Sequence, residues 1–289
     1  MHRMQTSMQP ASQACSRQQP AGAWAEERAI ASTMPELPEV EAARNTAATH
    51  CLSATITRVS ALEQGGGPRS GSFDDIVIGE GVTAAQLTAA LTGRVLQAVR
   101  RKGKHMWFEL SGGGPQAVFH FGMTGALVVN GVAPLKYQEF KVDLEFPPKF
   151  CKLELQFSNG ARLAFADPRR LGRIYLRRSP LTQKPVSALA PDPVTDLPDL
   201  ASFETALAAT AMPIKAALLD QQRAVCGVGN WVADETLHAA AVHPACLCNR
   251  LAKEQVAAIY TAARDVCATA CAVDADSTRF PVEWLFHTR

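Results

Sequence analysis

Short runs of apolar, β-favouring residues fill the stretch from residue 52 to residue 178, and Gly, Pro or Asn separate them. This pattern is typical of strands in an all-β unit. The expected strands cover residues 54–60, 94–99, 106–110, 117–121, 126–129, 152–157, 162–166 and 174–177. One helical period interrupts them at Thr83–Leu91. The pattern therefore predicts a β-sandwich or flattened barrel with a single helical insertion.

The apolar period is helical on both sides of this β region. Before it, the spacing of Val40, Ala43 and Ala47 predicts a short amphipathic helix from about Glu39 to near His50. After it, the expected features are a helix capped by Ser202, a second helix opened by Pro213, and two more at Asn230–Ala241 and Lys253–Ala272. The fold class expected is therefore α+β with two domains: a two-sheet β-sandwich with flanking helices, then an all-helical domain.

Composition divides the chain further. Residues 1–33 are rich in Gln, Ser and Ala without a sustained period, which predicts a disordered extension, either a transit segment or a misassigned start. Pro180–Pro198 holds five prolines and reads as a linker. The expected units are an extension at 1–33, a β-sandwich domain at 34–179, a linker at 180–199, a helical domain at 200–276 and a final aromatic stretch at 277–289.

The composition excludes some classes of protein and suggests others. No apolar run approaches the roughly 20 residues that a membrane helix needs, so we expect no membrane partner. The eight cysteines contain no Cys-x-x-Cys pair, so we expect neither a metal nor another cofactor. The net charge is only +2, but basic residues crowd into 94–105 and 162–178. Such stripes suit a groove that meets phosphate, and a solvated face is the alternative interpretation.

Pro35 is the residue with the most unusual possible reactivity in the chain. Residues 34–41 read Met-Pro-Glu-Leu-Pro-Glu-Val-Glu. If Met34 were an initiator that is removed, Pro35 would carry a free secondary amine with a pKa of about 8, against about 10.4 for lysine. Attack of that amine on a sugar carbon gives an iminium, the intermediate of a lyase. As an internal residue, Pro35 has no basic nitrogen.

Two neighbouring features could assist that amine. Glu36 lies beside it near the positive end of the first helix, which suits a proton shuttle, although such a glutamate is often only a dipole partner. The segment Arg100–His105 separates two expected strands, so we expect a hairpin at which Gly103 takes a positive φ and points Lys104 outward. An ordinary solvated turn is the alternative.

Two turns that contain glycine or proline display side chains that could insert between DNA bases, and we call these side chains wedges. His120–Gly125 displays Met123, and Asp167–Gly172 displays Arg169 followed by Leu171. Side chains of this kind could fill the space that an extruded nucleotide leaves, although each turn alone is more often structural.

A third turn suits an anion. The sequence Cys-Gly-Val-Gly-Asn at 226–230 lies between two expected helices, so its N–H groups and the next helix's positive end could converge on phosphate. Asn230 adds a donor, and Lys215 could reach the same group. A simple helix C-cap is the alternative.

Together these motifs resemble the formamidopyrimidine-DNA glycosylase family over residues 34–289. The resemblance rests on five motifs in the family's order: Pro-Glu-Leu-Pro-Glu-Val-Glu at 35–41, Lys-Gly-Lys-His at 102–105, Gly-Met-Thr-Gly at 122–125, Asp-Pro-Arg-Arg at 167–170 and Gly-Val-Gly-Asn-Trp at 227–231. Ala-Asp-Glu after Trp231 and His243-Pro244 look most like the plant and fungal branch.

The resemblance implies a role for each matched residue. Pro35 would be the nucleophile at C1′, Glu36 the proton donor and acceptor, and Lys104 the lysine that contacts phosphate and assists base release. The DNA contacts implied are Met123, Arg169 and Leu171 in the helix gap, and Lys215, Asn230 and His120 at phosphates. The implied fold is a β-sandwich followed by a helix–two-turns–helix domain, with DNA between them.

The sequence departs from the family pattern in three places. Leu171 stands where bacterial members have phenylalanine, which makes the wedge less aromatic. Phe280–Arg289 resembles only the lead into the metal-free finger of the plant and fungal branch, so we expect a truncated finger. Residues 1–33 precede the motif that the family carries at its N-terminus.

The resemblance implies a base-excision-repair DNA glycosylase with AP lyase activity. Its substrate would be double-stranded DNA with formamidopyrimidines, further-oxidised guanine or 8-oxoguanine, or with abasic sites, and the protein would act as a monomer. The alternative is a binding protein for damaged DNA that cannot cleave, because Pro35 is blocked and the finger is missing. A helix–two-turns–helix RNA binder is a third interpretation. The compartment expected is the nucleus, or the chloroplast or mitochondrion if residues 1–33 are a transit segment.

Overall fold

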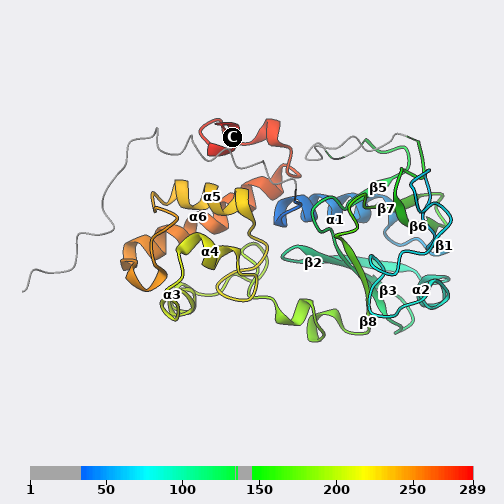
Figure 1. Cartoon of the computed structure of the whole chain (residues 1–289), viewed down its shortest axis with the longest axis horizontal. Helices are drawn as coiled ribbons and strands as arrows, with labels where there is room; N and C mark the ends of the chain where they lie inside the picture. The colour runs from blue at the N-terminus through cyan, green and yellow to red at the C-terminus, as the bar shows by residue number, and fades with distance from the viewer. Residues whose placement is uncertain (1–33, 134, 136–144, 289) are drawn as a thin grey trace, which may run out of the picture.

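The computed structural model describes residues 34–133, 135 and 145–288, and it consists of a sheet half and a helical half (Figure 1). The sheet half begins with α1 (Leu37–Cys51) and contains α2 (Ala84–Leu91) among eight strands. The strands are β1 (Ile56–Ser60), β2 (Leu96–Lys102), β3 (His105–Leu110), β4 (Gln116–His120), β5 (Ala126–Val129), β6 (Cys151–Phe157), β7 (Arg162–Ala166) and β8 (Arg173–Arg177).

These strands form two antiparallel four-stranded sheets, in the orders β1-β6-β7-β5 and β2-β3-β4-β8. The expected two-sheet sandwich is therefore confirmed, and each strand lies within three residues of its predicted bounds. The helix before the sheets begins at Leu37, two residues earlier than its apolar period indicates, because Pro38 fits the first turn of a helix.

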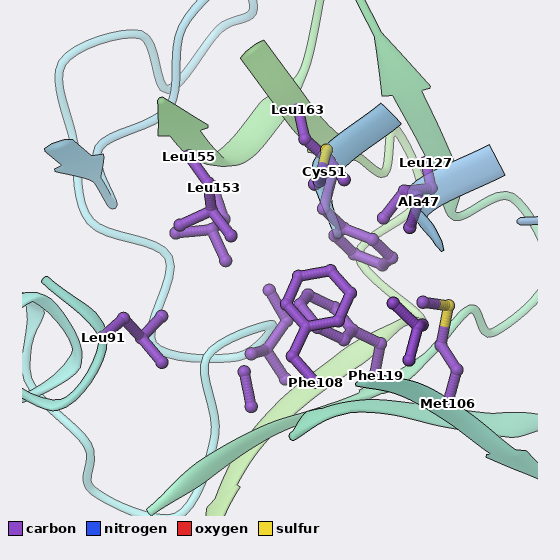
Figure 2. Packing of buried hydrophobic residues seen from close by; sticks show 14 of the residues in the cluster. Ala47, Cys51, Leu91, Met106, Phe108, Phe119, Leu127, Leu153, Leu155 and Leu163 are labelled. Atoms are coloured by element: carbon purple, nitrogen blue, oxygen red, sulfur yellow. The ribbon is translucent and has the colours of Figure 1, made fainter. Parts of the chain in front are cut away.

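Aromatic and aliphatic side chains from both sheets meet in one core (Figure 2). Phe119 lies at its centre, with ring centroids 5.0 Å from Phe108 in its own sheet and 5.9 Å from Phe165 in the other. Ala47 and Cys51 of α1 cover the same core and are fully buried. Burial of large apolar side chains, each contributing roughly 1.5–3 kcal/mol, thus joins the two sheets to the end of α1.

The helical half contains α3 (Leu200–Ala208), α4 (Ile214–Leu219), α5 (Asn230–Ala239) and α6 (Lys253–Ala272). The Asp199 carboxylate caps α3 by accepting the Ser202 N–H at 2.8 Å, so the prediction that Ser202 is the cap is wrong. An aspartate accepts this bond as well as a serine hydroxyl does. The core of this half includes Leu37, the first residue of α1. Figure 1 shows α1 lying between the sheets and the helices α5 and α6.

The proline-rich segment 180–199 is packed against both halves. Val186 is buried against Trp107 and Val118 of the sheet half. Asp192 is fully buried, and the Cys226 N–H donates to the Pro191 carbonyl at 2.9 Å. This segment therefore packs against the sheet half and the helical half as well as connecting them. Among the described residues, no helix combines the length and apolar character needed to cross a membrane.

Candidate active site

The carboxylate of Glu36 lies at the N-terminus of α5, where three backbone N–H groups bind it. Gly229 and Val232 donate to Oε2 at 2.8 and 3.1 Å, and Trp231 donates to Oε1 at 3.0 Å. A Cβ at Gly229 would overlap this carboxylate, which explains the glycine. The N–H groups of the turn at 226–230, which the sequence predicts to meet a phosphate, thus bind the Glu36 carboxylate in this structure.

Glu36 is completely buried. Burial raises the pKa of Glu36, while Lys104 and the three N–H groups lower it. Pro35, the residue before it, is also buried. The Leu37 N–H donates to the Gly227 carbonyl at 3.0 Å and so fixes the segment that carries both residues.

Lys104 belongs to the same buried cluster. Gly103 adopts the expected positive φ of 55° in the turn between β2 and β3. The prediction that Lys104 points outward is wrong, because only 8% of the residue is exposed. The turn is docked on the helical half so closely that a Cβ at Gly103 would lie 2.8 Å from Cys226 Sγ. Burial lowers the pKa of Lys104, and the charges of Glu36 and Glu39 oppose that shift.

A buried ion pair holds the Lys104 turn in place. Asp192 accepts hydrogen bonds from the Arg101 guanidinium and from the Gly103 N–H, the latter at 2.7 Å. Arg101 Nε also donates to Glu41 Oε2 at 2.7 Å. The linker, the hairpin and α1 are therefore connected by charge-assisted hydrogen bonds, which are stronger than neutral ones.

Glu39 is a second buried carboxylate in the site, and the sequence marks it only as the approximate start of the first helix. Its Oε2 accepts the Glu36 N–H at 3.0 Å, and its Oε1 accepts the Trp231 indole N–H at 3.1 Å. Burial and the neighbouring Glu36 raise the pKa of Glu39 to about 8. A buried carboxyl group with a raised pKa therefore lies one hydrogen bond from the Pro35–Glu36 segment.

The structure brings the two predicted wedge turns together. Thr124 Oγ1 in the first turn donates to Asp167 Oδ1 in the second at 2.7 Å, and Asp167 also accepts the Gly172 N–H at 2.7 Å. A Cβ at Gly122 would overlap the Leu171 backbone. The candidate DNA contacts on these turns are partly or largely exposed: Met123, Arg169 and Leu171.

Arg170 anchors the second turn to the sandwich. It has a positive φ of 57°, and its guanidinium binds Asp74 at 2.7 and 3.0 Å. Asp74 also lies 3.1 Å from Lys152 Nζ, which contacts Glu63 as well. The side chains of Lys152, Glu63 and Asp74 are each 1% exposed. A buried charge network thus supports the turn that displays Arg169.

His120 ends β4 as a neutral hydrogen-bond donor. Its Nδ1 accepts the Gly122 N–H at 3.3 Å, which leaves the proton on Nε2. The His105 ring lies against it, with centroids 4.7 Å apart. Burial, with the charges of Lys104 and Arg173, lowers the pKa of His120 to about 4. Such an N–H suits the phosphate contact that the resemblance implies.

Lys215 and Asn230 lie on adjacent helices. Lys215 Nζ lies 2.6 Å from Asp234 Oδ1 on α5, and Asn230 is the first residue of that helix and is partly exposed. Contact of these two residues with a DNA phosphate stays a prediction.

The basic stripes are only partly available to DNA. Arg94 donates to backbone carbonyls, among them those of Ser111 and Leu110. Ion pairs within the protein engage most of the other arginines in these stripes: Arg100 with Glu109, Arg101 with Asp192, Arg162 with Glu154, Arg170 with Asp74 and Arg177 with Glu80. Many charges in these runs are therefore paired within the protein, and their contact with phosphate stays a prediction.

Comparison with known proteins agrees with this geometry. Residues 34–174 match the family described as formamidopyrimidine-DNA glycosylase N-terminal domain, and residues 189–282 match its H2TH domain. A formamidopyrimidine-DNA glycosylase of Arabidopsis thaliana is 38% identical over 258 residues, which are 89% of this chain and 63% of that protein. The chain thus spans less than two thirds of this relative's length. A Mycobacterium ulcerans relative with the same name is 32% identical, covering 81% of this chain and 76% of its own.

Solved structures show the same fold. The MutM (Fpg) protein of Thermus thermophilus matches with a TM-score of 0.65 at 29% identity, covering 88% of this chain and 85% of its own. A MutM complex with DNA containing carbocyclic 8-oxo-G matches with a TM-score of 0.67 at 26% identity, covering 84% and 83%. The two domain matches follow each other in one chain, as the two halves of the structure do. This chain therefore belongs to the formamidopyrimidine-DNA glycosylase family.

Proposed function

We propose that this chain is a base-excision-repair DNA glycosylase with AP lyase activity, in which Pro35 supplies the nucleophile. The observation that carries the proposal is the buried cluster at the junction of the two halves. There Glu36 is bound by three N–H groups of α5, beside Pro35 and under the influence of Lys104. These groups supply a nucleophile, a proton shuttle and a cation in one water-poor site.

The chemistry follows from a secondary amine. The Pro35 nitrogen forms a bond to C1′ and loses its proton, the glycosidic bond breaks, and the base leaves with the electron pair and takes up a proton. Opening of the C1′–O4′ bond, with Glu36 as the proton source for O4′, gives the iminium. The iminium acidifies C2′, so loss of that proton expels the 3′ phosphate, and a second elimination expels the 5′ phosphate. Hydrolysis then frees Pro35.

The proposed substrate is double-stranded DNA that carries an oxidised purine or an abasic site. Two observations support it. The joined turns of Met123 and Arg169 present partly exposed side chains that suit the space left by an extruded nucleotide. Related solved structures contain DNA with carbocyclic 8-oxo-G or with an AP site. Formamidopyrimidines and further-oxidised guanine are the substrates that we favour, and 8-oxoguanine is a further candidate.

The proposal requires a free amine at Pro35. In the chain as written, its nitrogen is an amide bonded to Met34, and an amide has no lone pair for attack. We therefore propose that the active form begins at Pro35, and that the form with residues 1–34 binds damaged DNA without forming the iminium.

Borohydride trapping on a duplex with one abasic site tests this directly. Two proteins are compared, one beginning at Met1 and one beginning at Pro35. Borohydride reduces an iminium to a stable amine, so a covalent protein–DNA band reports the intermediate. We expect the band for the protein beginning at Pro35, and for the other only after mass spectrometry shows removal of residues 1–34.

A control protein beginning at Pro35 with Glu36→Gln separates chemistry from binding. It should still bind the duplex in a gel-shift assay, while trapping falls about 100-fold or more. If the protein beginning at Pro35 binds the abasic duplex but forms no covalent band at any pH, the enzyme proposal is wrong. The chain would then be a binding protein for damaged DNA.

A further inference from the structure

Trp231 connects the two buried carboxylates of the site, and only 4% of it is exposed. Its backbone N–H donates to Glu36 Oε1 at 3.0 Å, and its indole N–H donates to Glu39 Oε1 at 3.1 Å. The Glu36 N–H in turn donates to Glu39 Oε2 at 3.0 Å. One residue therefore donates to both carboxylates, and a hydrogen bond from the Glu36 backbone to the Glu39 side chain also links the two residues.

Aromatic side chains of the segment Phe280–Phe286 pack against the Trp231 ring. Phe280 stacks on the indole with centroids 5.5 Å apart at 26°, and Phe286 meets it edge-on at 5.3 Å. The Glu235 carboxylate on α5 accepts the N–H groups of Leu285 and Phe286 at 3.2 and 3.0 Å. Hydrogen bonds from these N–H groups to Glu235 thus hold the segment on α5, and the rings of the segment pack against the Trp231 indole.

We propose that Trp231 is a positioning residue for the reaction, which holds Glu36 and Glu39 through its two N–H groups while the aromatic segment Phe280–Phe286 immobilises its ring. This inference rests on the proposed function, because it assigns a task within that site. It adds Glu39 to the site as the carboxyl group whose proton and charge act on Glu36.

The charge on Glu39 depends on groups from every element around it. Burial and the charge of Glu36 on its own segment disfavour ionisation, while the N–H groups of Glu36 and Trp231 favour it. Lys104 from the β2–β3 turn attracts a charged Glu39, and Cys271 of α6 also faces it. With a pKa of about 8, Glu39 is neutral below that pH and adds a second negative charge beside Glu36 above it. Losing the indole donor should raise this pKa further.

A measurement on the full-length chain tests the hydrogen bond without any catalysis. The indole N–H resonance of Trp231, assigned by its absence in Trp231→Phe, should titrate with a midpoint near pH 8. Glu39→Gln should abolish that titration while the resonance remains. The internal control is the Trp284 indole, which packs on Trp231 and makes no hydrogen bond to a carboxylate within the described part of the chain. A Trp231 resonance that does not respond to pH, or that responds equally in Glu39→Gln, overturns the proposal.

The second measurement is the pH profile of borohydride trapping with proteins that begin at Pro35. Trp231→Phe keeps an aromatic ring and the backbone N–H but loses the indole donor, so the Glu39 inflection should move up by about one pH unit. Trp107→Phe is the matched control and should follow the wild type, because Trp107 packs in a separate cluster with Val118 and Val186. Glu39→Gln should lack that inflection and keep the one of the Pro35 amine.

The outcomes of this assay separate the two proposals. If the wild type forms the trapped complex and Trp231→Phe gives the same pH profile, Trp231 does not position Glu39. The inference then fails while the proposed function stands. If the wild type binds DNA but never traps, the proposed function fails, and the resonance titration still decides whether the hydrogen bond exists.

Discussion

Gly229 is the residue on which the position of the Glu36 carboxylate depends. A methyl group there would occupy the place of the Glu36 carboxylate, and a flexible side chain yields more easily than the backbone of α5 does. We therefore expect Gly229→Ala to expel the carboxylate while the fold persists. Trapping by the protein beginning at Pro35 should fall about 100-fold or more, the loss typical of a displaced proton shuttle, with affinity for the abasic duplex within a few-fold of the wild type.

Gly79→Ala is the matched control for this substitution. A Cβ at Gly79 would meet its nearest neighbour at 3.9 Å, an ordinary contact, and the residue lies in the sheet half away from α5. Gly79→Ala should form as much borohydride-trapped protein–DNA complex as the wild type. Equal trapping by both variants would mean that Glu36 keeps its place without the three N–H groups, or that its place is unimportant.

At the residue scale, the sequence predicts candidates for the reactive groups but not the contacts that hold them in place. Pro35, Glu36 and Lys104 were predictable because unusual residue types and turn glycines mark them. The tasks of Glu39 and Trp231 were not, because they depend on a contact between segments 192 positions apart. A buried carboxylate and an exposed helix-terminus carboxylate look identical in a sequence.

At the scale of elements, the turn that displays Arg169 depends on a buried charge network. Arg170, at a φ that L-residues rarely adopt, is held by Asp74, which also neutralises buried Lys152. Strand bounds were predictable because apolar runs and turn residues are local signals. The charge network was not predictable, because Asp74 and Arg170 are 96 positions apart and the sequence around each looks like solvated surface.

Removal of the Asp74 charge should therefore destabilise the protein. Asp74→Asn leaves Lys152 with Glu63 alone, so we expect the free energy of unfolding to fall by about 3 kcal/mol in urea denaturation at neutral pH. The exposed neighbour Asp75→Asn should change it by less than about 0.5 kcal/mol. Equal stability of the two variants would show that the network contributes nothing.

The same network makes a prediction about pH. Burial by itself would raise the pKa of Asp74, but hydrogen bonds from Arg170 and Lys152 outweigh it and hold that pKa well below its usual range. A lowered carboxyl pKa contributes stability above the unfolded-state value, and this contribution is lost as the pH falls below about 4. The stability difference between wild type and Asp74→Asn should therefore shrink on acidification, as urea denaturation at a series of pH values would show.

At the scale of the whole molecule, α1 and the 180–199 connection join the two halves around the site. Leu37 belongs to the helical core, whereas Val40, Ala43 and Ala47 belong to the sheet core, so Glu36 lies where the cores meet. The division into a β unit and a helical unit was predictable from the change of period. The packing of the proline-rich connection was not, since its composition indicates only a spacer and its buried contacts are long-range.

Asp192 is where that packing acts on the site, because it holds Arg101 and the Gly103 N–H next to Lys104. Asp192→Asn would leave a buried guanidinium with Glu41 as its remaining carboxylate partner, so we expect a loss of about 3–5 kcal/mol in the free energy of unfolding. Asp220→Asn, which removes a partly exposed pair with Arg223, should cost less than about 1 kcal/mol. Under conditions where both variants are folded, only Asp192→Asn should slow trapping by the protein beginning at Pro35, since the Lys104 turn is released. A variant that loses stability but traps at the wild-type rate would limit Asp192 to joining the halves, with Lys104 held by the rest of its hairpin.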